Sequence, residues 1–156
     1  MMKKTFLIFC FSYLLLLCSS CLKGDEGCVP KTVQSEEGQM QAYASSNGIT
    51  PTVHTSGLYY QIINAGTGAP PTLTSNVSVK YTGKLTNGTI FGQSSTPLTL
   101  SLSTVIAGWQ IGIPLIGEGG VIKLIIPSSL AYGCVANGSI PANSVLFFEV
   151  ELVDIL

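Results

Sequence analysis

Apolar residues recur at every second position in several short segments of the C-terminal two thirds of the chain. In NVSVKYTGKL, Val77, Val79 and Tyr81 alternate with polar residues, a spacing that places them on one face of a β-strand. Further strand candidates are GLYYQIIN, TIF, LTLSL, VIKLIIP and NSVLFFEVELVDI, the last with apolar residues on both faces. Turn signals such as Asn87-Gly88 separate the segments. Repeated strands joined by turns predict an antiparallel sheet.

Two short segments depart from this alternation and are predicted to be helical. VIAGWQIGI, at residues 105–113, carries no charge and holds the only tryptophan, Trp109, between two glycines. SEEGQMQAYASSNGI begins at Ser35, a suitable N-cap, and ends at Asn47-Gly48, a helix stop signal. The predicted fold class is therefore α+β, with an antiparallel sheet folded over one short helix and a short N-terminal helix packed on the domain.

The N-terminus has the features of a secretory signal. MMKK is positively charged, TFLIFCFSYLLLL is apolar but too short for a membrane-spanning helix, and CSSC follows. Ser20 before Cys21 resembles the end of a bacterial lipobox. We expect residues 1–20 to be a lipoprotein signal peptide and Cys21 to carry the lipid; cleavage nearby without lipidation is the alternative. Acyl chains on Cys21 would anchor the protein in the bacterial envelope, at the periplasmic or surface face of the outer membrane.

The rest of the chain divides into three parts. Residues 21–34 would form a lipid-anchored tether, residues 35–50 the helical extension and residues 51–156 the main domain. The helical extension could serve dimerisation or pack on its own domain. We expect packing, and therefore a monomer.

Two cysteines remain once the signal and the lipid are accounted for. These are Cys28 and Cys134, and in an oxidising compartment we expect them to form a disulfide. Two free thiols, one of them buried, are the alternative. By the chain-entropy model, closing a loop of about 100 residues would stabilise the fold by up to ~4.7 kcal/mol.

The charge and the catalytic inventory exclude many functions. Seven basic and eight acidic residues give a net charge of −1 with no basic stripe, so no nucleic-acid partner is expected. The only histidine, His54, lies in PTVHTS, a predicted loop, which leaves no Ser-His or Cys-His dyad and no multi-histidine metal site. Neither a G-x-S-x-G nucleophile motif nor a P-loop occurs. We therefore expect neither a metal nor a cofactor.

Four linked motifs carry a resemblance to a known family. VKYTGKLTNGTIF, VIAGWQIGIPLI, LIIPSSLAYG and IPANSVLFFEVELVD, in this order and spacing, resemble an FKBP-type peptidyl-prolyl cis/trans isomerase domain over about residues 57–156. The resemblance implies a half-open antiparallel β-sheet wrapped around one short helix, with Trp109 at the floor of a cleft. It also implies isomerisation of X-Pro segments in unfolded or exported proteins, and a macrolide of the family as a possible inhibitor.

The resemblance also assigns the residues of the cleft. The implied catalytic residues are Tyr81, Phe91, Trp109, Tyr132 and Phe148, and the implied substrate-binding residues are Leu98, Val105, Ile106 and Ile140. The Tyr132 hydroxyl would donate a hydrogen bond to a substrate carbonyl. The segment of Val105 and Ile106 would present a backbone N–H at the rim.

Two positions depart from the family pattern. Gly92 stands where an Asp usually follows the wall Phe, and Leu98 replaces a usual aromatic residue. A hydrogen bond that involves a charged group contributes about 1.5–3 kcal/mol, so its loss from the transition state would slow turnover by roughly 10- to 150-fold. A second hypothesis is therefore a proline-binding chaperone or adaptor module with weak or no isomerase activity. A third is a surface antigen in which the fold is only a scaffold.

Overall fold

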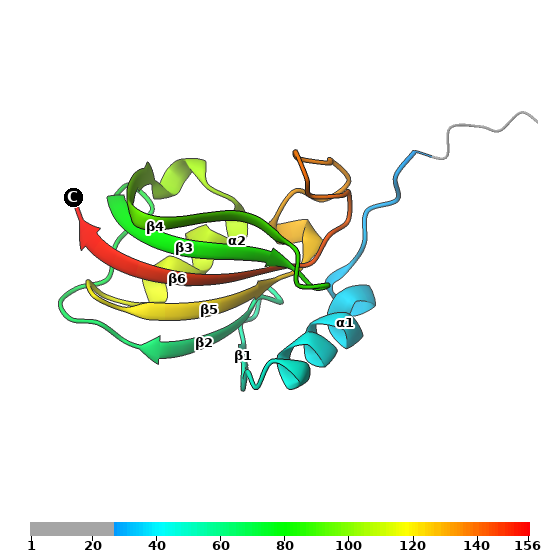
Figure 1. Cartoon of the computed structure of the whole chain (residues 1–156), viewed down its shortest axis with the longest axis horizontal. Coiled ribbons are helices and arrows are strands. Elements are labelled where there is room, and N and C mark those ends of the chain that lie inside the picture. Colours follow the sequence, from blue (N-terminus) through cyan, green and yellow to red (C-terminus); the bar gives the residue numbers. More distant parts are fainter. Residues whose placement is uncertain (1–26) are drawn as a thin grey trace, which may run out of the picture.

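The computed structural model describes residues 27–156, and it confirms the predicted α+β fold. One antiparallel sheet of six strands, in the order β1-β2-β5-β6-β3-β4, lies over the short helix α2 (Figure 1). The strands are β1 (Thr52–Val53), β2 (Tyr59–Asn64), β3 (Asn76–Leu85), β4 (Ile90–Ser101), β5 (Val121–Ile126) and β6 (Leu146–Ile155). The helices are α1 (Val33–Ser46) and α2 (Ala107–Gly112), with the 3₁₀ turns η1 (Leu102–Thr104), η2 (Ile113–Leu115) and η3 (Ser128–Leu130).

The main core lies between the sheet and α2. Its fully buried aliphatic residues are Leu58, Val77, Val79, Leu102, Ile113, Ile122, Leu124, Ile126, Leu146, Val150 and Leu152. Each such side chain contributes about 1.5–3 kcal/mol by leaving water. Val77 and Val79 are buried as predicted, but Ser78, expected on the polar face, is buried too. Tyr81 is only partly buried because it lines the cleft described below.

The last strand of the chain lies in the middle of the sheet. β6 pairs with β3 on one side and with β5 on the other. Neighbouring side chains on a strand point to opposite faces. Accordingly, Phe148 joins the core around α2, while Phe147 joins a second core under α1. This central position explains why the segment is apolar on both faces.

Helix α1 covers the second face at one end of the sheet (Figure 1). Its residues Met40, Tyr43 and Ala44 pack with Ile125 and Phe147. Helix α1 therefore packs on the sheet of its own domain, as expected.

The start of α1 differs from the expectation of a Ser35 N-cap. The helix begins at Val33, and the N-cap is Thr32, whose side-chain oxygen accepts a hydrogen bond from the Ser35 N–H at 3.2 Å. Threonine and serine are both good N-caps, so residue type alone did not distinguish Thr32 from Ser35.

Strand β4 also differs from the expectation. The two short strands expected from TIF and LTLSL form one strand with an irregularity. Val79 pairs with Leu98 but Tyr81 pairs with Ser94, so β4 has extra residues at this point. A β-bulge of this kind bends a strand and redirects its side chains. Thr52–Val53, in the expected loop, forms the short edge strand β1.

The structure contains the predicted disulfide between Cys28 and Cys134, with a Cα–Cα distance of 5.5 Å that suits such a bridge. The expected signal peptide at residues 1–20 and the expected lipidated Cys21 lie outside the described residues. Within residues 27–156, no helix has the length and apolar character needed to cross a membrane.

Candidate active site

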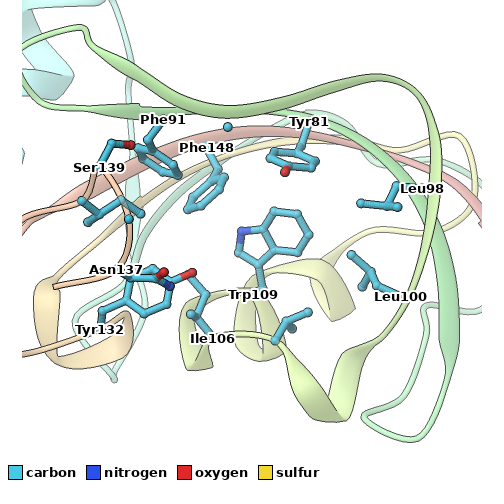
Figure 2. Close-up of a pocket in the computed structure, with 14 residues that line it drawn as sticks. Tyr81, Phe91, Leu98, Leu100, Ile106, Trp109, Tyr132, Asn137, Ser139 and Phe148 are labelled. Atoms are coloured by element: carbon cyan, nitrogen blue, oxygen red, sulfur yellow. The ribbon is translucent and has the colours of Figure 1, made fainter. Parts of the chain in front are cut away.

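A cleft of about 490 Å³ opens between the sheet, α2 and the connection from β5 to β6 (Figure 2). All nine residues that the resemblance assigned to a site line this cleft, namely Tyr81, Phe91, Leu98, Val105, Ile106, Trp109, Tyr132, Ile140 and Phe148. Gly92, expected at the cleft as the position of the missing Asp, also lines it, and four further lining residues were not expected from the sequence: Leu100, Asn137, Gly138 and Ser139. A volume of this size is in the range of small-ligand sites.

Trp109 forms the floor of the cleft. It lies on α2, and only 4% of its surface is exposed. The indole meets the rings of Tyr81 and Phe148 edge to face, with centroid distances of 5.4 Å and 5.2 Å. This geometry is favourable for aromatic rings. The indole Nε1 is buried and has no hydrogen-bond partner within the described part of the chain.

Three strands supply the walls. Tyr81 comes from β3 and Phe148 from β6, while β4 contributes Phe91, Leu98 and Leu100. Phe91 stacks edge to face on Phe148 at 5.3 Å. Figure 2 shows Leu98 and Leu100 at the opposite end of the cleft from Phe91, and Leu98 is 45% exposed.

The remaining wall comes from the β5–β6 connection and the start of α2. Tyr132, Asn137 and Ser139 lie at the same end of the cleft as Phe91 (Figure 2). Ile106 precedes the first residue of α2, and its backbone N–H has no acceptor among residues 27–156. The Asn137 and Ser139 side chains were missed because loop residues have no periodicity to reveal their direction.

The cleft carries polar groups but no charged side chain among its lining residues. Besides the buried indole N–H, its polar groups are two phenols, an amide and a hydroxyl, which can donate hydrogen bonds to carbonyl groups. His54 lies elsewhere, after β1, with its Nδ1 at 2.9 Å from the Ser56 hydroxyl. No three His, Cys, Asp or Glu side chains within residues 27–156 are grouped so that they could share a metal ion.

Gly92 lies beside the Tyr81 hydroxyl at the wall of the cleft. A Cβ atom at Gly92 would lie 3.4 Å from that oxygen, an ordinary contact distance. A side chain at this position would therefore reach the Tyr81 phenol without a clash. With glycine there, the hydroxyl is left facing the cleft (Figure 2).

Comparisons with known proteins agree with this geometry. The sequence model of the family described as FKBP-type peptidyl-prolyl cis-trans isomerase matches residues 68–153. The isomerase FkpA of Aeromonas hydrophila is 45% identical over 136 residues, which cover 85% of this chain and 50% of the relative. The protein named outer membrane protein MIP of Legionella longbeachae is 36% identical, over 80% of this chain and 56% of its own length.

The crystal structure of FkpA from Escherichia coli superposes with a TM-score of 0.70 at 38% identity. That superposition covers 79% of this chain and 60% of the other. The chain spans about half the length of the relatives that it matches in sequence.

Proposed function

The chain belongs to the FKBP-type peptidyl-prolyl cis-trans isomerase family, and on that premise we propose that its cleft binds X-Pro segments and accelerates rotation of their peptide bonds. The observation that carries the proposal is the uncharged aromatic cleft with the Trp109 indole at its floor. The substrates would be unfolded or exported proteins that expose proline.

The reaction suits a site without a reactive side chain. Twisting a peptide bond destroys amide resonance, which accounts for a barrier of roughly 18–20 kcal/mol. The twisted amide is less dipolar than the planar one. An apolar, water-poor cleft therefore destabilises the planar amide relative to the transition state, and the difference lowers the barrier.

The cleft residues then take separate roles. The proline ring would lie on the Trp109 indole, between the rings of Tyr81 and Phe148, where it is removed from water. The Tyr132 hydroxyl and the Ile106 N–H would donate hydrogen bonds to carbonyl groups on either side of the twisting bond.

A second candidate function rests on Gly92. Without an acidic side chain beside it, the Tyr81 hydroxyl lacks the carboxylate that the family pattern would supply. The site would then bind proline segments as a chaperone or adaptor module and catalyse weakly or not at all.

The experiment compares catalysis with binding for the protein that lacks residues 1–21. A protease-coupled assay on a short X-Pro peptide measures isomerisation, and Trp109 fluorescence measures binding of the peptide and of a macrolide of the family. A rate above the spontaneous one supports the isomerase. Binding of the peptide without a rate above the spontaneous one supports the chaperone module. If the protein neither binds the peptide nor accelerates isomerisation, the fold serves only as a scaffold.

We further propose that Cys21 is lipidated and that the protein is anchored at the periplasmic or surface face of the outer membrane. The apolar signal-like segment and CSSC support this, as does a relative named as an outer membrane protein. Incorporation of labelled palmitate into the full chain tests it. Cys21→Ser should abolish the label, whereas Cys10→Ser should not; retention of the label in Cys21→Ser would contradict the proposal.

A further inference from the structure

Residues 127–143, in the connection between β5 and β6, carry Tyr132 and Ile140 into the cleft. The hydrogen bonds between their backbone groups are internal. They are the bonds from the N–H of Leu130, Ala131, Gly133, Val135, Asn137, Ile140 and Asn143, and each ends on a carbonyl of residues 127–143. Leu130, Ala131 and Ile140 pack on the main core. Polar contacts with other parts of the chain are the further means of fixing the 127–143 loop relative to the cleft.

Apart from the bond that the neighbouring Ser144 hydroxyl donates to the Pro141 carbonyl, the hydrogen bonds between the 127–143 loop and the rest of the described chain join it to residues 28–36. Glu36 of α1 is 1% exposed, and its Oε2 accepts a hydrogen bond from the Ser128 N–H at 2.8 Å. Ser128 is the first residue of η3, so this N–H has no partner inside the turn. The Glu36 carboxyl thus anchors the loop four residues before Tyr132.

A second attachment lies just beyond Tyr132. Cys134 is joined to Cys28 by the disulfide. The Asn143 side-chain amide donates to the Val29 carbonyl at 2.9 Å. Asn143 is also the one non-glycine residue of the described chain with a left-handed backbone, at φ 56°. The two attachments therefore flank Tyr132 in sequence.

The Glu36 contact is not what stability alone would select. The other carboxyl oxygen, Oε1, and the Ser128 hydroxyl are both buried without hydrogen-bond partners in the described chain. Burying polar atoms without partners is unfavourable. The buried Glu36 carboxyl meets a segment that carries a site residue, so the contact can serve to fix the position of that segment.

We propose that residues 28–36 form a clamp that positions Tyr132, with Glu36 as the positioning residue and the disulfide as the second attachment. The proposal rests on the proposed function, because Tyr132 is the group through which the clamp would act. It gives the N-terminal helix a role in the reaction without contact with the substrate.

The test combines Glu36→Ala, Glu36→Gln and Tyr132→Phe in the disulfide-bonded protein. Glutamine keeps an acceptor for the Ser128 N–H, so Glu36→Gln should retain kcat/KM near the wild-type value. Glu36→Ala should lower kcat/KM by no more than the loss of the Tyr132 hydrogen bond would, which is about 2- to 12-fold. In the Tyr132→Phe background, Glu36→Ala should have no further effect. An equal loss in both backgrounds would overturn the proposal.

Glu37→Ala is the matched control, because Glu37 is exposed on the same turn of α1 and bonds only to Gln41. It should leave kcat/KM unchanged. Circular dichroism shows whether Glu36→Ala is folded. If it is not, Cys28→Ser combined with Cys134→Ser replaces it, and the loss of kcat/KM is again compared between the wild-type and the Tyr132→Phe backgrounds.

A readout independent of activity separates this proposal from the proposed function. Hydrogen–deuterium exchange should become faster at amides 131–140 in Glu36→Ala and stay unchanged in β5 and β6. Unchanged exchange in the loop would overturn the clamp even in an active enzyme. If the protein shows no isomerase activity but exchange in the loop becomes faster in Glu36→Ala, the clamp is supported and only the proposed function fails.

Discussion

A Cβ atom at Gly108 would lie 2.5 Å from Cγ2 of Ile126. Real Cβ atoms do not approach other carbons so closely, so only glycine allows α2 to lie against β5 at this distance. The glycines around Trp109 therefore have a packing function. They bring the helix close enough to the sheet for the indole to become the floor of the cleft.

We predict that Gly108→Ala destabilises the protein by about 1–3 kcal/mol, the usual cost of overpacking a core. The free energy of unfolding in urea measures this. Gly38→Ala in α1 is the control, because a Cβ there meets no atom within 4 Å. It should stabilise the protein by up to about 1 kcal/mol, since alanine is the better helix former. Equal effects of the two substitutions would contradict the packing explanation.

We predict that Gly92→Asp raises kcat/KM by up to roughly 10- to 150-fold, because the new carboxylate can accept a hydrogen bond from the Tyr81 hydroxyl. The protease-coupled assay measures the change. Gly92→Asn is the matched control, with the same shape and no charge, and should give a smaller increase. If neither variant exceeds the wild type, Gly92 is not what limits catalysis.

We predict that Tyr132→Phe lowers kcat/KM by about 2- to 12-fold, because one hydrogen bond to the twisting substrate is lost. The free energy of unfolding should change by less than about 0.5 kcal/mol, as is usual for substitutions that remove no packing. Tyr60→Phe, on β2 and away from the cleft, should change neither quantity. An unchanged kcat/KM in Tyr132→Phe would remove this hydroxyl from the site.

We predict that replacing both Cys28 and Cys134 by serine lowers the free energy of unfolding by up to ~4.7 kcal/mol. The bridge closes a sequence separation of 106 residues, and the reduced unfolded chain gains the corresponding freedom. Urea denaturation measures the loss, and reduction of the wild-type protein should reproduce it. Mass spectrometry that finds two alkylatable thiols in the non-reduced protein would contradict the bridge.

We predict that α1 docking weakens in alkaline solution. Burial raises the pKa of the Tyr43 phenol above its ordinary value of about 10, so the folded state holds this proton more tightly than the unfolded state. The resulting stabilisation is fully present below about pH 10 and is lost as the pH rises through the folded pKa. Between about pH 9 and about pH 11, the free energy of unfolding should fall less in Tyr43→Phe than in the wild type. Equal falls would show that Tyr43 does not contribute.

The strand and helix segments were predictable because their signals are local. The alternation around Val77 predicted β3, and the uncharged segment around Trp109 predicted the short helix. The boundary of α1 was less predictable, because Thr32 and Ser35 can both cap a helix. The irregularity of β4 depends on its register with β3, which no single segment encodes.

The cleft illustrates the same division. Its aromatic residues were identified through motifs that lie far apart in the sequence, whereas Asn137 and Ser139 were not identified. Their segment has no hydrophobic period, and the direction of a loop side chain depends on what the loop packs against.

The sequence by itself determined most of the local elements and the family, because both depend on residue types at short or fixed spacing. Only the tertiary structure decided that β6 lies between β3 and β5, that Gly92 leaves the Tyr81 hydroxyl facing the cleft, and that Glu36 reaches Ser128. The Glu36 contact joins residues 92 positions apart, so its existence depends on how the whole core packs. Local patterns select helices and strands, but long-range packing decides which side chains meet.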